Sequence, residues 1–397
     1  MISKKMRPLV ENNSAIRVMF EEGKRLAGIY GAENVYDFSL GNPNVPAPSS
    51  VNQAIADVLR GEDSVTVHGY MSNAGFSDTR RAVAGSLNRR FGTNFKEENI
   101  VMISGAAGGL NAVLKAILDP GDEVVTFAPY FLEYRNYVAN YDARLVEVPP
   151  DTETFQPDLA ALERTITEKT RAVLINNPNN PTGVVYPKAV IAGMAKVLEE
   201  KERAYGHAIY LISDEPYREL AYDGAQVPFV TGYYADSIVV YSFSKSLSLP
   251  GERIGYVAVP DEAEDADNLT QAIVIANRVL GHVNAPSLMQ RMLVRCIDEE
   301  TDLEAYNRNR KLLYEGLTEC GFQCVKPEGA FYLFVKSPTA DENQFCEAAK
   351  KHNILFVPGS SFACPGFVRI AYCVSYDTIK NSLPAFRKLA EEYHLNM

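Results

Sequence analysis

From residue 100 to residue 259, short apolar runs alternate regularly with longer segments of helical periodicity. Strands that alternate with helices favour a parallel sheet covered by helices on both faces. Runs such as AVLI and AIYLI are apolar at nearly every position, which is typical of strands buried on both sides. We therefore predict an α/β fold with a mostly parallel, seven-stranded sheet flanked by helices. Its strands are expected at residues 100–104, 123–127, 144–148, 172–176, 208–213, 238–242 and 254–259.

A second, smaller α+β unit is predicted after residue 285, where long charged helices precede the runs PEGAFYLFVK, ILFVPG and FVRIAYCVS. The first 45 residues could pack with either unit, and we group them with the second. The predicted domains are therefore a large one at 46–285 and a small one formed by 1–45 together with 286–397. Helices are expected at residues 14–31, 75–91, 107–118, 187–205, 285–298 and 301–320, and from 375 onward.

Composition excludes several classes of protein. The 397 residues carry 39 basic and 50 acidic side chains, a net charge of −11, which argues against nucleic acid or an anionic membrane as partner. No apolar run is long enough to span a bilayer, and the start MISKKMRPLVENNS lacks the apolar core of a signal peptide. The six cysteines show no metal-binding spacing. We expect free thiols in a cytoplasmic protein without a metal site.

Open α/β sheets place their chemistry at the carboxyl ends of the strands, so the residues that follow each strand are informative. The strand ending at Asn176 runs into NNPNNPTG, which is either a simple sharp loop or a support that holds Asn180 rigidly. The next strand ends in SDEPY. Asp214 there is either a helix N-cap or a buried carboxylate with a cationic partner, and Tyr217 could point to the same site.

The segment SFSKSLSLPGER, residues 242–253, is the most specific of these strand ends. Lys245 is its only lysine and is either a surface side chain or an amine positioned for Schiff-base chemistry. Ser242, Ser244, Ser246 and Arg253 together offer the hydroxyl donors and the bidentate cation that a phosphate requires.

A second phosphate-binding element is possible at SGAAGGL, residues 104–110, which follows a strand and opens a helix. Small residues at a helix start let backbone N–H groups reach a phosphate, although glycines also permit close packing of a helix on a sheet. The pattern matches neither GxGxxG nor a Walker loop, which disfavours a nucleotide.

In this order and spacing, NNPNNPTG, SDEPY and SFSKS…GER make the sequence resemble the class I/II aminotransferases that depend on pyridoxal phosphate, the aspartate aminotransferase-like superfamily of fold type I. The matching motifs extend from Gly41 to Arg369, so the resemblance covers nearly the whole chain. It implies pyridoxal 5′-phosphate as the cofactor.

The resemblance implies roles for the residues that would hold the cofactor ring. Lys245 would bind the cofactor as a Schiff base and move the substrate's α-proton. Asp214 would keep the pyridine nitrogen protonated, so that the ring withdraws electrons. Asn180 and Tyr217 would donate hydrogen bonds to the ring's phenolic oxygen. Phe131 would stack on the ring; the chain has no Trp, the residue common at this position.

The resemblance also implies how the phosphate is held. Ser242, Ser244 and Arg253 would bind it with their side chains, and Ala106 and Ala107 would bind it through backbone N–H groups.

The substrate's α-carboxylate would be clamped by Arg369 and approached by Asn180 and the backbone of Gly41. Tyr70, in HGYMSNAG, matches a tyrosine that reaches the phosphate of the neighbouring subunit. The resemblance therefore implies a homodimer with shared active sites.

The expected activity is transfer of the amino group of an L-amino acid, with aspartate favoured, to a 2-oxo acid such as 2-oxoglutarate. An aspartate-specific enzyme needs a second cation, for which Arg278, Lys115 and Arg135 are candidates. Alanine, aromatic or sulfur-containing donors remain open, as does a C–S β-lyase of the same superfamily. A ligand-sensing domain fused to a DNA-binding domain is disfavoured by the net charge and by a start close to the family's first helix.

Overall fold

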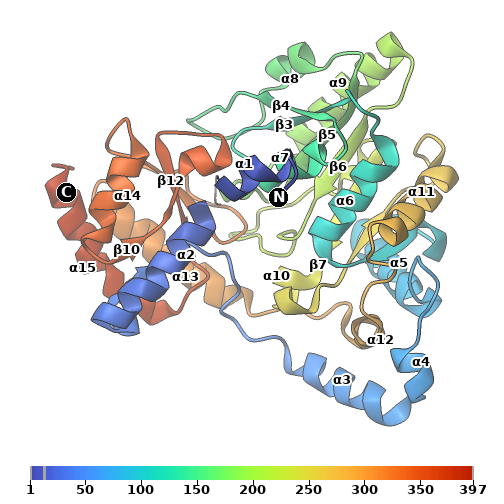
Figure 1. Cartoon of the computed structure of the whole chain (residues 1–397), viewed down its shortest axis with the longest axis horizontal. Coiled ribbons are helices and arrows are strands. Elements are labelled where there is room, and N and C mark those ends of the chain that lie inside the picture. The colour runs from blue at the N-terminus through green and yellow to red at the C-terminus, as the bar shows by residue number, and fades with distance from the viewer. Residues whose placement is uncertain (1, 12–14, 396–397) are drawn as a thin grey trace.

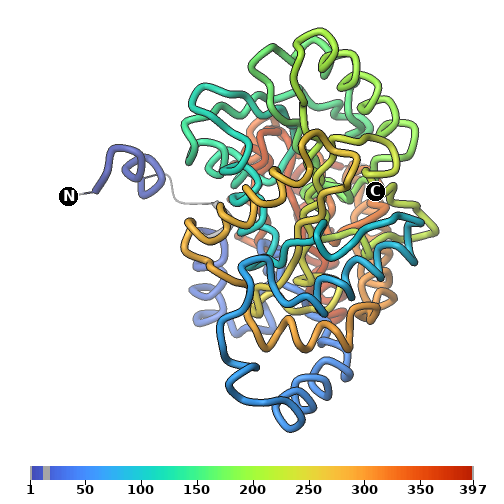
Figure 2. The backbone as a smooth tube through the Cα atoms, turned by 90° about the vertical axis from the view of Figure 1, so that its right-hand side faces the viewer, coloured from blue at the N-terminus to red at the C-terminus, as the bar shows by residue number. Residues whose placement is uncertain are grey.

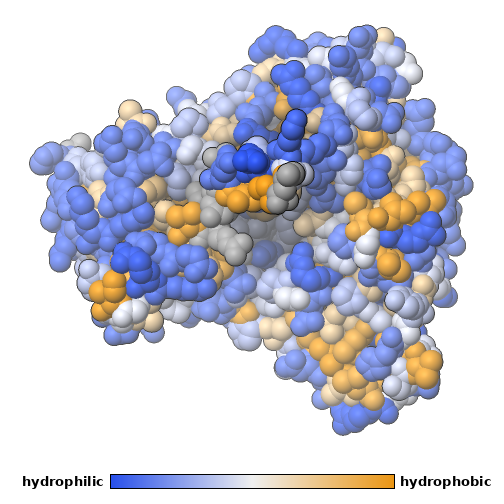
Figure 3. Space-filling view, viewed as in Figure 1, coloured by the Kyte–Doolittle hydropathy of each residue, from blue (hydrophilic) through white to orange (hydrophobic). Residues whose placement is uncertain are grey.

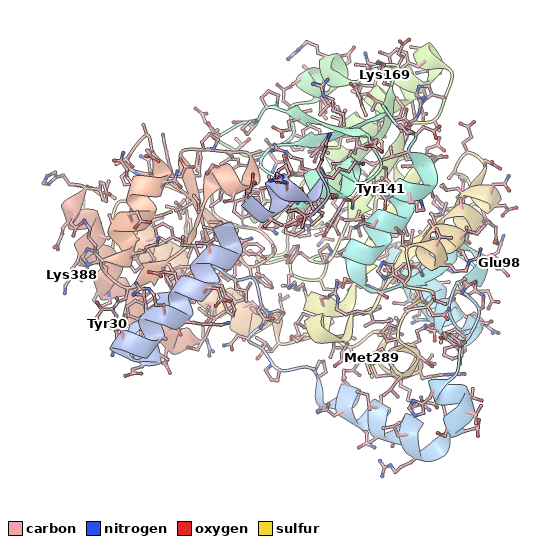
Figure 4. The ribbon with its side chains drawn as sticks, viewed as in Figure 1. Tyr30, Glu98, Tyr141, Lys169, Met289 and Lys388 are labelled. Atoms are coloured by element: carbon pink, nitrogen blue, oxygen red, sulfur yellow. The ribbon has the colours of Figure 1, made fainter. Side chains whose placement is uncertain are left out.

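The computed structural model of the chain describes residues 2–11 and 15–395, which form two lobes (Figure 1). Tyr30 and Lys388 lie in the left-hand lobe of that view and Lys169 in the right-hand lobe (Figure 4). The division of the chain at residues 45 and 285 stays a prediction.

The large lobe is built on the seven-stranded sheet that the sequence predicts. Its strand order is β2-β8-β7-β6-β5-β3-β4, and all neighbours run parallel except β8, which is antiparallel to both β2 and β7. The α/β fold with a mostly parallel sheet is thus confirmed. The strands are β2 (Ile100–Ile103), β3 (Glu123–Phe127), β4 (Arg144–Val148), β5 (Thr170–Asn176), β6 (Tyr210–Asp214), β7 (Ser237–Ser242) and β8 (Gly255–Ala258).

Helices cover both faces of this sheet, because successive strand side chains point to opposite sides. Val101 and Ile103 of β2 pack into one core cluster, and Ile100 and Met102 pack into the other. The first cluster includes α6 (Gly105–Ile117), α7 (Glu133–Ala139) and α11 (Ala266–Val279). The second includes α3 (Ser49–Gly61), α5 (Ser77–Phe91), α8 (Leu159–Thr165), α9 (Lys188–Tyr205) and α12 (Ser287–Cys296).

Gly109 explains how α6 comes so close to the sheet. A Cβ at this position would lie 2.1 Å from Cδ1 of Ile103 and 2.9 Å from Cγ1 of Val240, so any larger residue would push the helix outward. At least this glycine of SGAAGGL therefore serves helix–sheet packing.

The smaller lobe has the α+β character that the sequence predicts. A three-stranded antiparallel sheet has the order β11-β12-β9, and a parallel pair joins β1 to β10. The strands are β1 (Tyr36–Asp37), β9 (Tyr332–Lys336), β10 (Ile354–Leu355), β11 (Val357–Pro358) and β12 (Phe367–Ala371). The helices are α2 (Ala15–Tyr30), α13 (Leu303–Glu319), α14 (Glu342–Lys350) and α15 (Tyr376–Glu392).

The seven predicted helices are present as α2, α5, α6, α9, α12, α13 and α15; Ser14, the predicted start of the first, lies outside the described residues. Helices α3, α11 and α14 were not predicted, nor were the shorter α1 (Met6–Glu11), α4 (Ser64–His68), α7, α8 and α10 (Phe243–Ser246). Helices of four to seven residues are too short for a periodic pattern, and the apolar run AIVIA of α11 suits a strand equally well. Figure 2 shows α1 standing away from the main body.

Within residues 2–11 and 15–395, no helix combines the length and the apolar character needed to cross a bilayer. No cluster of three or more potential metal ligands occurs among the same residues. All six cysteines are free thiols.

Candidate active site

A cavity of about 610 Å³ lies at the carboxyl ends of β5 and β6 and is also lined by residues of the smaller lobe. It brings together residues that the sequence analysis selected from segments far apart in the chain. The selected residues that line it are Gly41, Ala106, Ala107, Phe131, Asn180, Asp214, Tyr217, Lys245 and Arg369.

Lys245 reaches the cavity from α10, a single turn directly after β7. The hydroxyl of Ser242 caps this turn by accepting a hydrogen bond from the backbone N–H of Ser244. Lys245 Nζ donates a hydrogen bond to the backbone oxygen of Gly41 at 2.9 Å. Burial lowers the pKa of Lys245 to about 8. A substantial fraction of this amine is therefore neutral near physiological pH, which makes it a nucleophile and a base.

Asp214 lines the same cavity from the end of β6. Its Oδ2 accepts a hydrogen bond from the hydroxyl of Tyr134 at 2.5 Å, whereas its Oδ1 has no partner among the described residues. Burial raises the pKa of Asp214 to about 7, and the Tyr134 hydrogen bond acts in the opposite direction. A buried carboxylate with one free oxygen suits a ligand that brings a positively charged N–H group.

The sequence motifs give no role to Tyr134. In APYFLEY the family resemblance points to Phe131 as the stacking residue, and Tyr134 lies three positions later. Phe131 lies two residues before α7 begins, so helical spacing gives no signal that links it to Tyr134. In the structure the two rings meet edge to face, with centroids 5.7 Å apart.

Arg369 lies on β12 and is almost fully buried. Its Nη1 donates to Asn180 Oδ1 at 3.1 Å and its Nη2 donates to the backbone oxygen of Ser39 at 2.7 Å. Its Nε has no partner in the described part of the chain. The guanidinium lies 4.5 Å from the ring centroid of Tyr332, whose hydroxyl is 2.9 Å from that of Tyr217.

Arg253 lies at the edge of this site and has the left-handed backbone conformation, with φ of 53°. Gly105, the first residue of α6, also has a positive φ, and a Cβ there would lie 2.7 Å from Nη2 of Arg253. The guanidinium of Arg253 therefore lies against the start of α6, where Ala106 and Ala107 line the cavity. A phosphate placed there would meet both the guanidinium and the backbone N–H groups of the helix start.

The two predicted phosphate-binding serines lie next to each other, with the hydroxyl of Ser244 2.7 Å from that of Ser242. Neither serine is among the residues that line the cavity.

Tyr70 does not reach the cavity of its own chain. Its side chain is 93% exposed and lies beside a separate hollow lined by residues that include His68 and His282. Its contact with the neighbouring subunit stays a prediction.

None of the three candidates for a second cation lines the cavity. Arg135 pairs with Glu147, Lys115 lies over the ring of Tyr141, and Arg278 is exposed on α11. The described cations that line the cavity are Lys245 and Arg369. The remaining wall combines the carboxylates of Asp214 and Glu133 with polar, apolar and aromatic groups. The apolar and aromatic ones include Phe20, Leu40, Leu110 and Tyr137.

Comparison with known proteins decides the family. The family model for aminotransferase class I and II matches residues 33–386. The chain belongs to this family. The match confirms the resemblance, and it shows that this aminotransferase is an enzyme.

Relatives and solved structures agree with this assignment. The aminotransferase is 34% identical to aspartate/prephenate aminotransferase of Thermus thermophilus, over 88% of this chain and 90% of that protein. It is 30% identical to aspartate aminotransferase of Thermotoga maritima, over 92% and 94% of the two chains. An aminotransferase structure from Eubacterium rectale superposes with a TM-score of 0.97 at 52% identity, covering 99% of both chains. Thermus thermophilus aspartate aminotransferase with maleate superposes with a TM-score of 0.86 at 28% identity, covering 98% and 99%.

Proposed function

We propose that this aminotransferase uses pyridoxal 5′-phosphate to move the amino group of an L-α-amino acid to a 2-oxo acid such as 2-oxoglutarate. The observation that carries the proposal is the placement of Lys245 and Asp214 in one cavity, with Asp214 Oδ1 unpartnered in the described structure. This arrangement fits the cofactor, because a pyridinium N–H would satisfy the free oxygen. When bound, the cofactor supplies a ring that withdraws electrons from the substrate's α-carbon.

Each side chain has one task in this proposal. Lys245 Nζ would hold the cofactor at its aldehyde carbon, and its neutral amine would be the base for the proton on the substrate's α-carbon. Asp214 would hold the ring nitrogen in its protonated form, and the hydrogen bond from Tyr134 favours the ionised form of the Asp214 carboxyl.

The α-carboxylate of the substrate is assigned to Arg369. Its guanidinium is planar and buried, and its Nε is left without a partner among the described residues. A carboxylate that approaches from the cavity would form a charge-assisted, bidentate pair with it. Because every α-amino acid carries this carboxylate, Arg369 selects the class of substrate and not its side chain.

Aspartate is the donor that the names of the Thermus and Thermotoga relatives support. One protomer's cavity has no second described cation for the distal carboxylate, so this assignment requires a cation from a partner subunit. A neutral aromatic donor is the second candidate. It is supported by the apolar and aromatic wall formed by Phe20, Phe131 and Tyr137, and by Glu133, which would repel a second carboxylate.

A homodimer is part of the proposal. Tyr70 and Val65 are 93% and 80% exposed, an unusual state for large apolar side chains. Figure 3 shows apolar surface over α3 and α4 at the bottom of the molecule and over α11 at the right. Leu59 of α3 and Ile275 of α11 are among the exposed apolar residues of these helices. This surface supports a second copy of the chain as the partner, with Tyr70 extending into its site.

One experiment tests the activity and separates the donors. The purified protein is mixed with pyridoxal phosphate and then with single amino acids, without a 2-oxo acid, while the visible spectrum is recorded. A spectral change with aspartate or glutamate supports the acidic donor, and a change with phenylalanine or tyrosine supports the aromatic one. Release of pyruvate and ammonia without an acceptor would instead indicate the β-lyase. No visible band after addition of the cofactor would refute the proposal.

A further inference from the structure

Tyr332 is a buried tyrosine at the start of β9 whose side chain lines the active-site cavity. It contacts two residues with proposed roles. Its hydroxyl is 2.9 Å from that of Tyr217, and its ring lies under the guanidinium of Arg369. A Cβ at Gly41 would lie 2.0 Å from the Tyr332 hydroxyl, so the backbone there also packs closely on this side chain.

We infer that Tyr332 is a positioning residue that orients the hydroxyl of Tyr217 toward the cofactor. The inference rests on the proposed function and on the role that the family resemblance implies for Tyr217, which is to donate a hydrogen bond to the cofactor's phenolic oxygen. A phenol has a single proton. Once that proton is directed at the cofactor, the hydrogen bond between the two tyrosines requires Tyr332 to donate and Tyr217 to accept.

Such a chain of donors strengthens each of its bonds, because a hydroxyl that accepts a hydrogen bond becomes a better donor.

Tyr217 comes from the loop after β6 and Tyr332 from the smaller lobe, so the contact also joins the two lobes at the cofactor site. Sequence analysis offered no reason to select Tyr332, since PEGAFYLFVK resembles any buried strand.

Tyr332→Phe tests this role, because it removes the hydroxyl and keeps the ring under Arg369. The readout is the pH midpoint of the visible band of bound pyridoxal phosphate. A weaker hydrogen bond to the phenolic oxygen leaves more negative charge near the Lys245 nitrogen, which then holds its proton more tightly. We expect the midpoint to rise by about half a pH unit or more, as for loss of one hydrogen bond. KM for amino acids should change little.

Tyr372→Phe is the matched control. Tyr372 is equally buried, donates to the backbone oxygen of Ala330 at 3.1 Å and is not among the residues that line the cavity, so its loss should leave the midpoint unchanged. Equal midpoints in wild type, Tyr332→Phe and Tyr372→Phe would overturn the inference. If none of the three proteins binds the cofactor, the proposed function fails instead.

A double variant tests whether Tyr332 acts through Tyr217. Tyr217→Phe/Tyr332→Phe should have the same midpoint as Tyr217→Phe alone, whereas additive shifts would contradict the inference. If Tyr332→Phe does not fold, Tyr332→His keeps a ring and a donor group. A midpoint near that of wild type then supports the inference, and one equal to that of Tyr217→Phe overturns it.

Discussion

Tyr134 donates a 2.5 Å hydrogen bond to Oδ2 of Asp214, and this is the one described hydrogen bond to the carboxylate of that residue. The bond joins the start of α7 to the end of β6, across 80 positions of the sequence. It opposes the effect of burial, and with this bond in place the pKa of Asp214 is still raised to about 7.

Tyr134→Phe should therefore weaken cofactor binding. Without the hydroxyl, the pKa of Asp214 rises further, more of the carboxyl is protonated at neutral pH, and its attraction for a pyridinium falls. We expect Kd for pyridoxal phosphate to rise about tenfold, the effect of one hydrogen bond to a charged group. Tyr130→Phe is the control, because Tyr130 donates to Glu147 and not to Asp214. Equal affinities in the two variants would contradict this role.

The lowered pKa of Lys245 predicts a pH dependence for capture of the cofactor by the free protein. Only the neutral amine reacts, and it predominates above the pKa, so the rate should increase as the pH rises through about 8. Stopped-flow absorbance would measure this rate at pH values between about 6.5 and 9.5, a range that extends roughly 1.5 units on either side of the pKa of Lys245. A midpoint near the ordinary lysine value of 10.5 would show that burial does not act on this group.

Lys245→Ala should show no visible band and no turnover while remaining folded.

Arg369→Lys should weaken the binding of all α-amino acids alike. Lysine keeps the positive charge but cannot form the bidentate pair, so KM should rise about tenfold or more for every donor, whatever its side chain. Steady-state kinetics with acidic, aromatic and small donors would measure this. A loss confined to one donor would move Arg369 to the pocket for the substrate side chain.

Glu133→Gln should favour acidic donors. The carboxylate of Glu133 lines the cavity and repels a second carboxylate in the substrate, so its removal should raise kcat/KM for aspartate by roughly threefold or more relative to phenylalanine. Glu147→Gln is the control, because Glu147 is not among the residues that line the cavity. The same donor ratio in both variants would exclude Glu133 as a determinant of specificity.

Arg218 should contribute to stability more than any surface pair. Its guanidinium pairs with Glu215, both side chains are almost fully buried, and the rings of Phe229 and Tyr241 lie within 5.0 Å of it. Arg218→Met leaves Glu215 buried without its partner and should lower the free energy of unfolding by about 3–5 kcal/mol in urea titrations. Arg135→Met, which breaks an exposed pair with Glu147, should cost less than about 1 kcal/mol. Similar losses in the two variants would contradict this account.

Much of the fold was predictable because its signals are local. The seven strands of the large sheet show as apolar runs, and the direction of β8 is the main feature that such runs do not reveal. Helix α11 was missed because its apolar stretch suits a strand as well as a helix. Lys245 and Asp214 were found because Asp214 ends a strand and Lys245 lies three residues after one, at the edge of the sheet where parallel strands end together.

The sequence by itself determined where the strands run and which reactive side chains stand at their ends, because periodicity and turn chemistry depend on neighbouring residues. Only the tertiary structure decided which groups support them. Tyr134 meets Asp214 across 80 positions and Tyr332 meets Tyr217 across 115. Such contacts arise from the packing of helices and lobes onto the sheet, and packing depends on the shapes of whole elements, which no local pattern records.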